Sequence, residues 1–286
     1  MTDPLLEHLV AVLSGVGGIE TVVLGGSRSR GDALPSSDYD LGLYFRDQRP
    51  IDVGGLRRAM EPLIDPGSEA IITAIGEWGP WIVGGGWLTI GGQAVDLLYR
   101  NVDAVSATID RAVAGTITVD YQPGHPHGFI STIWLAEVHH CQPLHDPAGA
   151  VAGLKCRLQP YPRRLALALV DRFQWEIGFA ATGAAKAIAR DDRSYIAGSI
   201  FRGLACAAQV ICAINGRYVM NEKGALALAG GLPLAPPNLG ARIDALWDRF
   251  AERDHAGAIE RLVMIERDVA GLVDDWRRTQ DQFPFR

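Results

Sequence analysis

The chain has 286 residues, 48% of them hydrophobic and 21% charged, with a formal net charge of −6 at pH 7. This is the composition of an ordinary globular protein, and the length is sufficient for two domains. Acidic side chains concentrate in residues 1–150, whereas residues 151–286 have a slight basic excess. That distribution is not the footprint of a nucleic-acid-binding surface.

No basic segment followed by an apolar core opens the sequence, so we expect a cytoplasmic protein with no membrane partner. The most apolar stretch, Gly203–Ile214, contains Gln209 and is too short to span a bilayer, so we interpret it as a buried helix. The cysteines form no CxxC pair and are expected to be reduced, buried thiols: Cys141, Cys156, Cys206 and Cys212. His139, His140, Cys141 and His145 lack the paired spacing typical of zinc ligands.

The first predicted elements are a helix and two strands, and the strands flank a glycine-rich loop and carry an aspartate pair. Asp3 and Pro4 are typical of a helix start, and Thr21–Leu24 is a β-branched run that predicts a buried strand. Residues 38–45 alternate in polarity, as a strand does. One face would carry Tyr39, Leu41, Leu43 and Phe45, and the other Asp38, Asp40, Gly42 and Tyr44. Both aspartates should therefore point the same way.

The next segments predict a helix over 56–63 and a hairpin formed by 87–90 and 94–99 around Gly91-Gly92. Asp96 lies in the middle of the second strand, where a charged side chain is costly unless it has a partner. Residues 129–139 are predicted to be helical, and 144–147 to form a turn.

Strand signals end near Leu154. Four segments with helical periodicity follow, at 164–190, 195–214, 239–253 and 256–277, and a Gly/Pro-rich connection occupies 231–237. The sequence therefore predicts an α/β (α+β) domain with a small mixed sheet over 1–150. An all-α helical bundle over 151–286 follows it.

The Gly-Ser loop and the three carboxylates together predict a nucleotide site. The loop around Gly26-Ser27 would bring backbone N–H groups to a phosphate. Asp38, Asp40 and Asp96 would repel one another without a cation, and Mg²⁺ prefers such oxygen ligands. Two Mg²⁺ ions could stabilise an in-line displacement that releases pyrophosphate. The alternative for Ser36-Ser37-Asp38 alone is a plain capped turn.

Other side chains have two interpretations each. Arg30 would contact either a strand carboxylate or phosphate. Trp78, Trp81 and Trp87 fit a core cluster better than a base-stacking platform. Lys223 is either a solvated lysine at a helix start or a triphosphate contact, and Arg202 either extends to solvent or contacts phosphate.

At these residues the chain resembles the polymerase-β-like nucleotidyltransferase superfamily. The resemblance rests on Gly26-Ser27, Arg30-Gly31, Ser37, Asp38-Tyr39-Asp40 and Asp96, and it covers roughly residues 20–100. Within that superfamily the layout is similar to the streptomycin/spectinomycin-type adenylyltransferases. There a helical C-terminal domain closes over the nucleotide and supplies a lysine. The resemblance implies catalytic and metal-binding roles for Asp38, Asp40 and Asp96. It implies nucleotide contacts for Gly26, Ser27, Arg30, Ser37 and Lys223, and the need for positive charge near a triphosphate adds Arg202 as a candidate.

The leading hypothesis is therefore a Mg²⁺-dependent enzyme that moves an NMP, most simply AMP from ATP, onto a hydroxyl of a small acceptor. Such an acceptor would be aminoglycoside-like, with antibiotic resistance as a possible role. A second hypothesis is a toxin-like enzyme that modifies tRNA or a protein, for which the basic excess in 151–286 is a weak indication. A third is a nucleotide-binding module without transferase activity.

Overall fold

The computed structural model describes residues 3–31, 34 and 37–282. The chain divides into two compact units. The sheet unit comprises Met1–Asp110 and Trp134–Pro160, and the helical unit comprises Arg111–Ile133 and Tyr161–Arg286. The boundary expected after residue 150 thus lies ten residues further along, and residues 111–133 belong with the helices.

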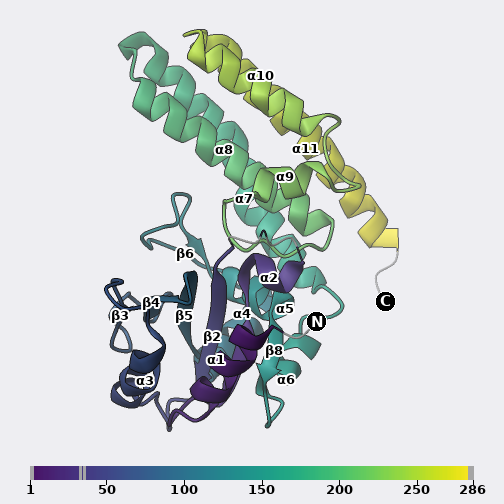
Figure 1. The fold of residues 1–286 in the computed structure, drawn as a ribbon. Coiled ribbons are helices and arrows are strands. Elements are labelled where there is room, and N and C mark those ends of the chain that lie inside the picture. Colours follow the sequence, from purple (N-terminus) through teal and green to yellow (C-terminus); the bar gives the residue numbers. More distant parts are fainter. Residues whose placement is uncertain (1–2, 32–33, 35–36, 283–286) are drawn as a thin grey trace. The chain divides into compact units, whose positions relative to one another are not determined.

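The sheet unit contains a six-stranded sheet in the order β3-β4-β5-β2-β1-β8 (Figure 1). Its strands are β1 (Thr21–Leu24), β2 (Tyr39–Phe45), β3 (Ile71–Ile72), β4 (Gly85–Ile90), β5 (Gln93–Asn101) and β8 (Gln142–His145). β2 and β5 run parallel, and the other paired strands run antiparallel. The predicted mixed sheet and the predicted hairpin, β4 with β5, are confirmed.

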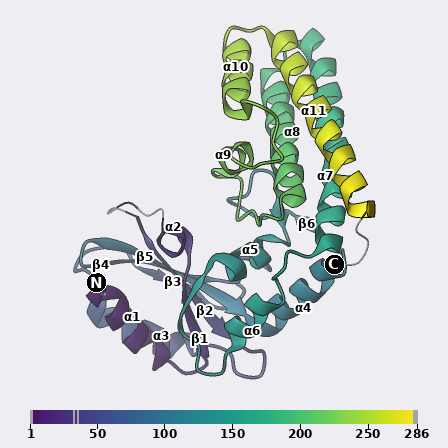
Figure 2. The same cartoon turned by 90° about the vertical axis from the view of Figure 1, so that its right-hand side faces the viewer.

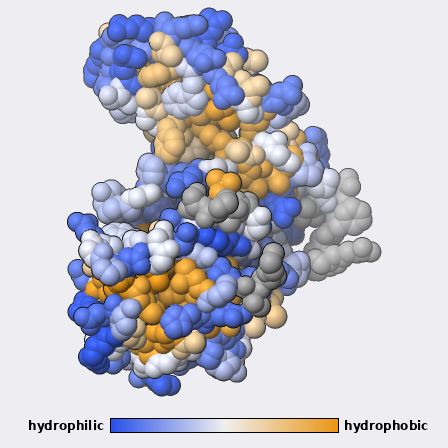
Figure 3. Space-filling view, in the orientation of Figure 1, coloured by the Kyte–Doolittle hydropathy of each residue, from blue (hydrophilic) through white to orange (hydrophobic). Residues whose placement is uncertain are grey.

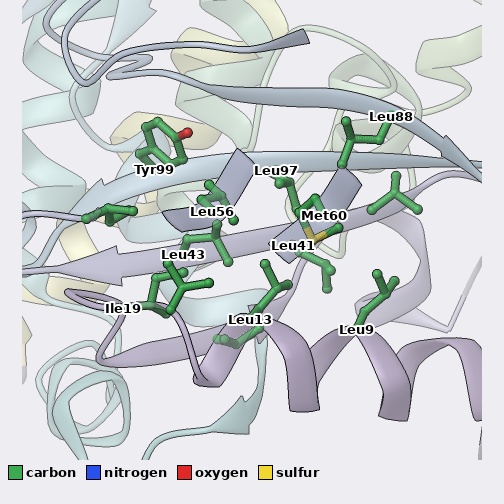
Figure 4. Close-up of a cluster of buried hydrophobic side chains, with 14 of the residues drawn as sticks. Leu9, Leu13, Ile19, Leu41, Leu43, Leu56, Met60, Leu88, Leu97 and Tyr99 are labelled. Carbon is green, nitrogen blue, oxygen red and sulfur yellow. The ribbon is translucent and has the colours of Figure 1, made fainter. Parts of the chain in front are cut away.

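One face of the sheet packs on two helices, α1 (Pro4–Ser14) and α3 (Val53–Met60), which a short 3-10 turn, η1 (Glu61–Leu63), extends. Figure 4 shows the core between them: Leu41 and Leu43 of the sheet point toward Leu9 and Leu13 of α1. Asp3 caps α1, because its Oδ1 accepts hydrogen bonds from two N–H groups of the first turn. The predicted alternation of β2 is confirmed, because its apolar face is buried here.

The opposite face packs partly on α5 (Ile133–His140). Arg100 of β5 is almost fully buried there, and its guanidinium binds both carboxylate oxygens of Glu137 at 2.6 and 2.7 Å. A buried ion pair is tolerated only with such complete pairing. α4 (Val102–Val113) follows β5, and α6 (Ala150–Cys156) follows β8.

Two local predictions were wrong. Residues 129–139 are not one helix, because β7 (Phe129–Ile130) pairs with β6 (Val119–Asp120) before α5 begins. Residues 144–147 are not only a turn, because β8 continues to His145 and pairs with β1 at the edge of the sheet. Both strands are very short, and their pairing depends on the strand beside them rather than on local propensity.

The helical unit is built on α7 (Arg163–Ala187), α8 (Arg193–Ile214) and α11 (His255–Gln282), with α9 (Ala225–Gly230), α10 (Leu239–Ala251) and the short η2 (Ile188–Arg190) (Figure 2). Figure 3 shows hydrophilic residues over the end of this unit where α8 begins and α10 ends. Hydrophobic residues gather around α9 in the same view.

Helix α8 is the one helix among the described residues that is long and apolar enough to cross a membrane, but 67% of its apolar window is buried in the helical unit. This confirms the interpretation of Gly203–Ile214 as a buried helix. The cysteine prediction holds only in part. Cys141, Cys206 and Cys212 are free and buried, whereas Cys156 is free and exposed in the last turn of α6.

Candidate active site in the sheet unit

The glycine-rich loop lies directly against Asp40. The Gly25 N–H donates a hydrogen bond of 2.8 Å to the Asp40 carbonyl, and α2 (Gly26–Arg30) begins at the next residue. Gly26 has φ +59°, and a Cβ placed on it would lie 1.7 Å from Asp40 Oδ2. Only glycine permits this approach. By helix geometry, the first-turn N–H groups of α2 lack acceptors within the helix, which suits an anionic ligand.

Two of the three predicted carboxylates are register partners in the sheet. Asp40 of β2 lies opposite Asp96 of the parallel strand β5. Their neighbours Leu41 and Leu97 are buried in the core, so both carboxylates project from the other face. Asp38 is exposed and lies immediately before β2. The structure therefore brings the loop and the carboxylates to one end of the sheet.

The carboxylates repel one another. Burial, followed by the charges of Asp40 and Asp38, raises the pKa of Asp96 to about 6. Burial and then the Asp38 charge also raise the pKa of Asp40, while Arg30 lowers it. A group that must be ionised near neutral pH in such surroundings requires a cation.

The donor chemistry fits a divalent cation, since Mg²⁺ prefers carboxylate oxygens and neighbouring carboxylates raise the pKa of Asp40 and of Asp96 after burial does. Within the described residues, however, no three His, Cys, Asp or Glu side chains already form a group that could hold a metal ion. A metal site made of Asp38, Asp40 and Asp96 therefore stays a prediction.

The raised pKa of Asp96 makes the stability of the metal-free protein depend on pH. The folded state retains a proton that the unfolded state loses from pH 3.8, so stability falls as pH rises from about 4 to 6. Asp96→Asn should raise the free energy of unfolding at pH 8 by about 1 kcal/mol, after discounting for partial exposure, and should give no gain at pH 4. Urea unfolding in EDTA measures this.

Glu69→Gln is the matched control, because it removes one exposed carboxylate from the same unit. It should leave the pH dependence unchanged. Mg²⁺ should stabilise the wild type at pH 8 more than Asp96→Asn. Equal pH profiles for wild type and Asp96→Asn would contradict the raised pKa of Asp96.

Arg28, which the sequence did not single out, holds the segment that carries Asp38. Its guanidinium donates to the carbonyls of Ser37 (2.7 and 3.1 Å) and Asp38 (3.1 Å) and lies 3.7 Å from the centre of the Tyr39 ring. The Tyr39 hydroxyl donates to Asp3 Oδ2 at 2.6 Å. These contacts join α2, α1 and the start of β2. Nothing in the local sequence pattern distinguishes Arg28 from other basic residues in a Gly-Ser loop, so this positioning role could not be predicted.

Ser37 and Arg30 have different surroundings. Ser37 Oγ accepts a hydrogen bond from the Leu34 N–H at 2.9 Å, which is the turn-capping role weighed for this segment. Arg30 is exposed at the end of α2, and its charge lowers the pKa of Asp40. Both interpretations of Arg30, a strand carboxylate or a phosphate, stay predictions. Ser27 lies in the first turn of α2, as the phosphate-loop prediction requires.

The two predicted basic contacts from the helical unit differ. Arg202 is exposed, and its Nε and Nη2 donate hydrogen bonds to Glu176 Oε2 at 3.0 and 2.5 Å. Glu176 is buried, and Arg172 also binds it. The burial of Glu176 requires these partners, which sequence reasoning missed, and a contact of Arg202 with phosphate stays a prediction. Lys223 is exposed, two residues before α9, next to Glu222, which accepts a 2.8 Å hydrogen bond from the His127 N–H.

The tryptophans do not form one core cluster. Trp87 is 50% exposed, and its ring stacks on Trp78 at a centroid distance of 4.5 Å. Trp81 meets Trp134 of α5 edge-on at 4.9 Å. The core interpretation was therefore wrong for Trp87, because β4 directs this side chain away from the core.

The comparison with protein families agrees with this geometry. Residues 7–71 match the nucleotidyltransferase domain family. No curated protein matches the chain. Among solved structures, a nucleotidyltransferase-like protein from Exiguobacterium sibiricum 255-15 aligns over 96% of this chain and 78% of its own, with 10% identity and a TM-score of 0.41. The family match includes the Gly-Ser loop, Asp38 and Asp40, so the sheet unit carries a nucleotidyltransferase domain and the chain is a nucleotidyltransferase.

Proposed function

We propose that this nucleotidyltransferase moves AMP from ATP onto a hydroxyl of a small, aminoglycoside-like acceptor, with Mg²⁺ as cofactor. The observation that carries the proposal is the Asp40–Asp96 register pair beside the Gly25–Gly26 loop. Such a pair has little structural value by itself, since two partly buried carboxylates destabilise each other. A bound cation would offset this repulsion, and it would also bind the phosphates of a triphosphate.

The reaction is a substitution at the α-phosphorus. The acceptor oxygen forms a bond to phosphorus as its proton passes to solvent, and the bond from phosphorus to the bridging oxygen breaks to release pyrophosphate. Bound Mg²⁺ would neutralise phosphate charge and polarise the phosphoryl oxygens. Asp40 and Asp96, with Asp38, would hold it. The N–H groups of Ser27 and its neighbours in α2 would bind the departing phosphates.

The test is transfer of label from α-labelled ATP in the presence of Mg²⁺. Streptomycin, spectinomycin, bulk tRNA and the protein itself serve as acceptors, and each NTP is compared with ATP. We expect acceptor-dependent pyrophosphate release, with label on a small molecule and none in EDTA. Label on tRNA or protein would support the toxin-like alternative instead. No release with any acceptor would support a binding module.

Lys223 is proposed to contact the triphosphate. Lys223→Ala should weaken ATP binding by about 1–3 kcal/mol, the value of a charge-assisted hydrogen bond. Calorimetry with ATP and Mg²⁺ measures this. The melting temperature without nucleotide should not change, because the side chain is exposed.

Lys186→Ala is the control, since it removes the same charge from an exposed position near the end of α7. It should bind ATP as the wild type does. Unchanged affinity in Lys223→Ala, or an equal loss in both variants, would contradict a specific contact.

A further inference from the structure

An exposed apolar surface continues the row of catalytic carboxylates across the sheet. Strand register places Asp40 opposite Asp96, Asp96 opposite Trp87, and Trp87 opposite Ile71. Residues directly opposite one another in a sheet share a face. The row therefore runs from the Gly25 loop, through the two carboxylates, to Trp87 and Ile71.

The apolar end of this row is exposed and carries a stacked pair of aromatic rings. Trp87 is 50% exposed and Ile71 is 44% exposed, whereas Leu88 on the opposite face of β4 is buried. The Trp78 ring stacks on Trp87 with an interplanar angle of 24°, and a Cβ on Gly85 would lie 3.0 Å from the Trp78 ring. That Cβ would also lie 1.8 Å from the Leu97 carbonyl oxygen of β5, so the close strand approach requires glycine here, and the Trp78 ring packs beside it on the indole of Trp87. Large exposed aromatic surface held in one orientation is typical of a binding site.

The geometry of an in-line displacement indicates which of the two substrates would contact Trp87 and Ile71. In an in-line displacement the attacking and leaving oxygens lie on opposite sides of the phosphorus. Phosphates held at the Gly26–Ser27 end would leave toward that end. The attacking hydroxyl must then arrive from the opposite end of the row, where Trp87 lies.

We propose that Ile71, Trp78 and Trp87 form the acceptor subsite, and that it takes a hydroxylated ring whose apolar face packs against the Trp87 indole. This proposal rests on the proposed nucleotidyl transfer and adds the part of the site that selects the acceptor. A sugar or cyclitol ring has the required character, with C–H groups on its face and hydroxyls at its edge. Trp87 is a specificity-determining residue that does not take part in the chemical step.

The experiment compares Trp87→Ala, Trp87→Phe and Trp175→Ala with the wild type. Trp175 is the matched control, because it is 56% exposed and lies on α7 of the helical unit. Calorimetry measures streptomycin and ATP binding separately, and kinetics give KM for each substrate. Trp87→Ala should raise the Kd and KM for streptomycin about tenfold, with ATP binding and kcat little changed. Trp87→Phe should recover part of the loss, and Trp175→Ala should bind as the wild type does.

Three outcomes would overturn the subsite. Weaker ATP binding with unchanged streptomycin binding would show that Trp87 stacks on the nucleotide base. Unchanged binding of both ATP and streptomycin in Trp87→Ala would show that this surface binds neither substrate. A wild-type protein that does not bind streptomycin would contradict the ring-binding role. Failure of the proposed function is distinguishable: streptomycin would bind through Trp87 by calorimetry, but no label would be transferred.

Discussion

Asp40→Asn should reduce nucleotidyl transfer by at least about 10³-fold, the equivalent of about 4 kcal/mol of transition-state stabilisation. Asp40 joins the loop to the carboxylate pair: its carbonyl accepts a hydrogen bond from Gly25, its side chain lies against Gly26, and Asp96 is its register partner. Asparagine keeps the shape but loses the charge that a cation requires. Pyrophosphate release with ATP, Mg²⁺ and streptomycin measures the loss.

The fold should survive this change. Burial raises the pKa of Asp40, so a neutral side chain relieves an unfavourable charge, and the melting temperature in EDTA should stay equal or rise. Glu69→Gln, an exposed charge in the same unit, should keep wild-type activity. Full activity in Asp40→Asn would refute the metal-dependent mechanism. Asp38→Ala tests the exposed carboxylate in the same assay.

Local sequence patterns predicted the elements that carry the site. The alternation of residues 38–45 placed Asp38 and Asp40 on one face, and the Gly91-Gly92 turn gave the hairpin with Asp96 on its second strand. These signals are local, because side-chain period and turn chemistry act within a few residues. The same rules predicted the long helices of the helical unit, whose periodic patterns are strong.

Long-range contacts could not be predicted in this way. The parallel pairing that sets Asp96 beside Asp40 joins strands separated by α3 and β4, and no local pattern fixes its register. Arg202 pairs with Glu176 on another helix, and Arg28 binds carbonyls about ten residues away. Each of these contacts forms only because the complete fold places the two partners side by side. Exposure of Trp87 likewise depends on what covers β4, because tryptophan is common in cores and in binding sites alike.

Gly26→Ala should both destabilise the sheet unit and reduce activity, because two separate effects meet at this residue. A residue with a side chain loses about 1–2 kcal/mol of folding free energy at a φ of +59°. The added Cβ would also lie 1.7 Å from Asp40 Oδ2. Relief of that overlap requires the loop or the carboxylate to move. A displacement of about 1 Å at a reacting centre can cost about 10²-fold in rate.

Gly31→Ala separates the two effects. Gly31 also has a positive φ, +79°, but nothing lies within 4 Å of a Cβ placed there. It should therefore lose about 1 kcal/mol of stability, measured by urea unfolding, and keep its transfer activity. Gly26→Ala should lose at least as much stability and also about 10²-fold or more in kcat, measured by pyrophosphate release. If the two variants lost activity equally, backbone conformation alone would explain the requirement for glycine. The close approach of the loop to Asp40 would then have no role in catalysis.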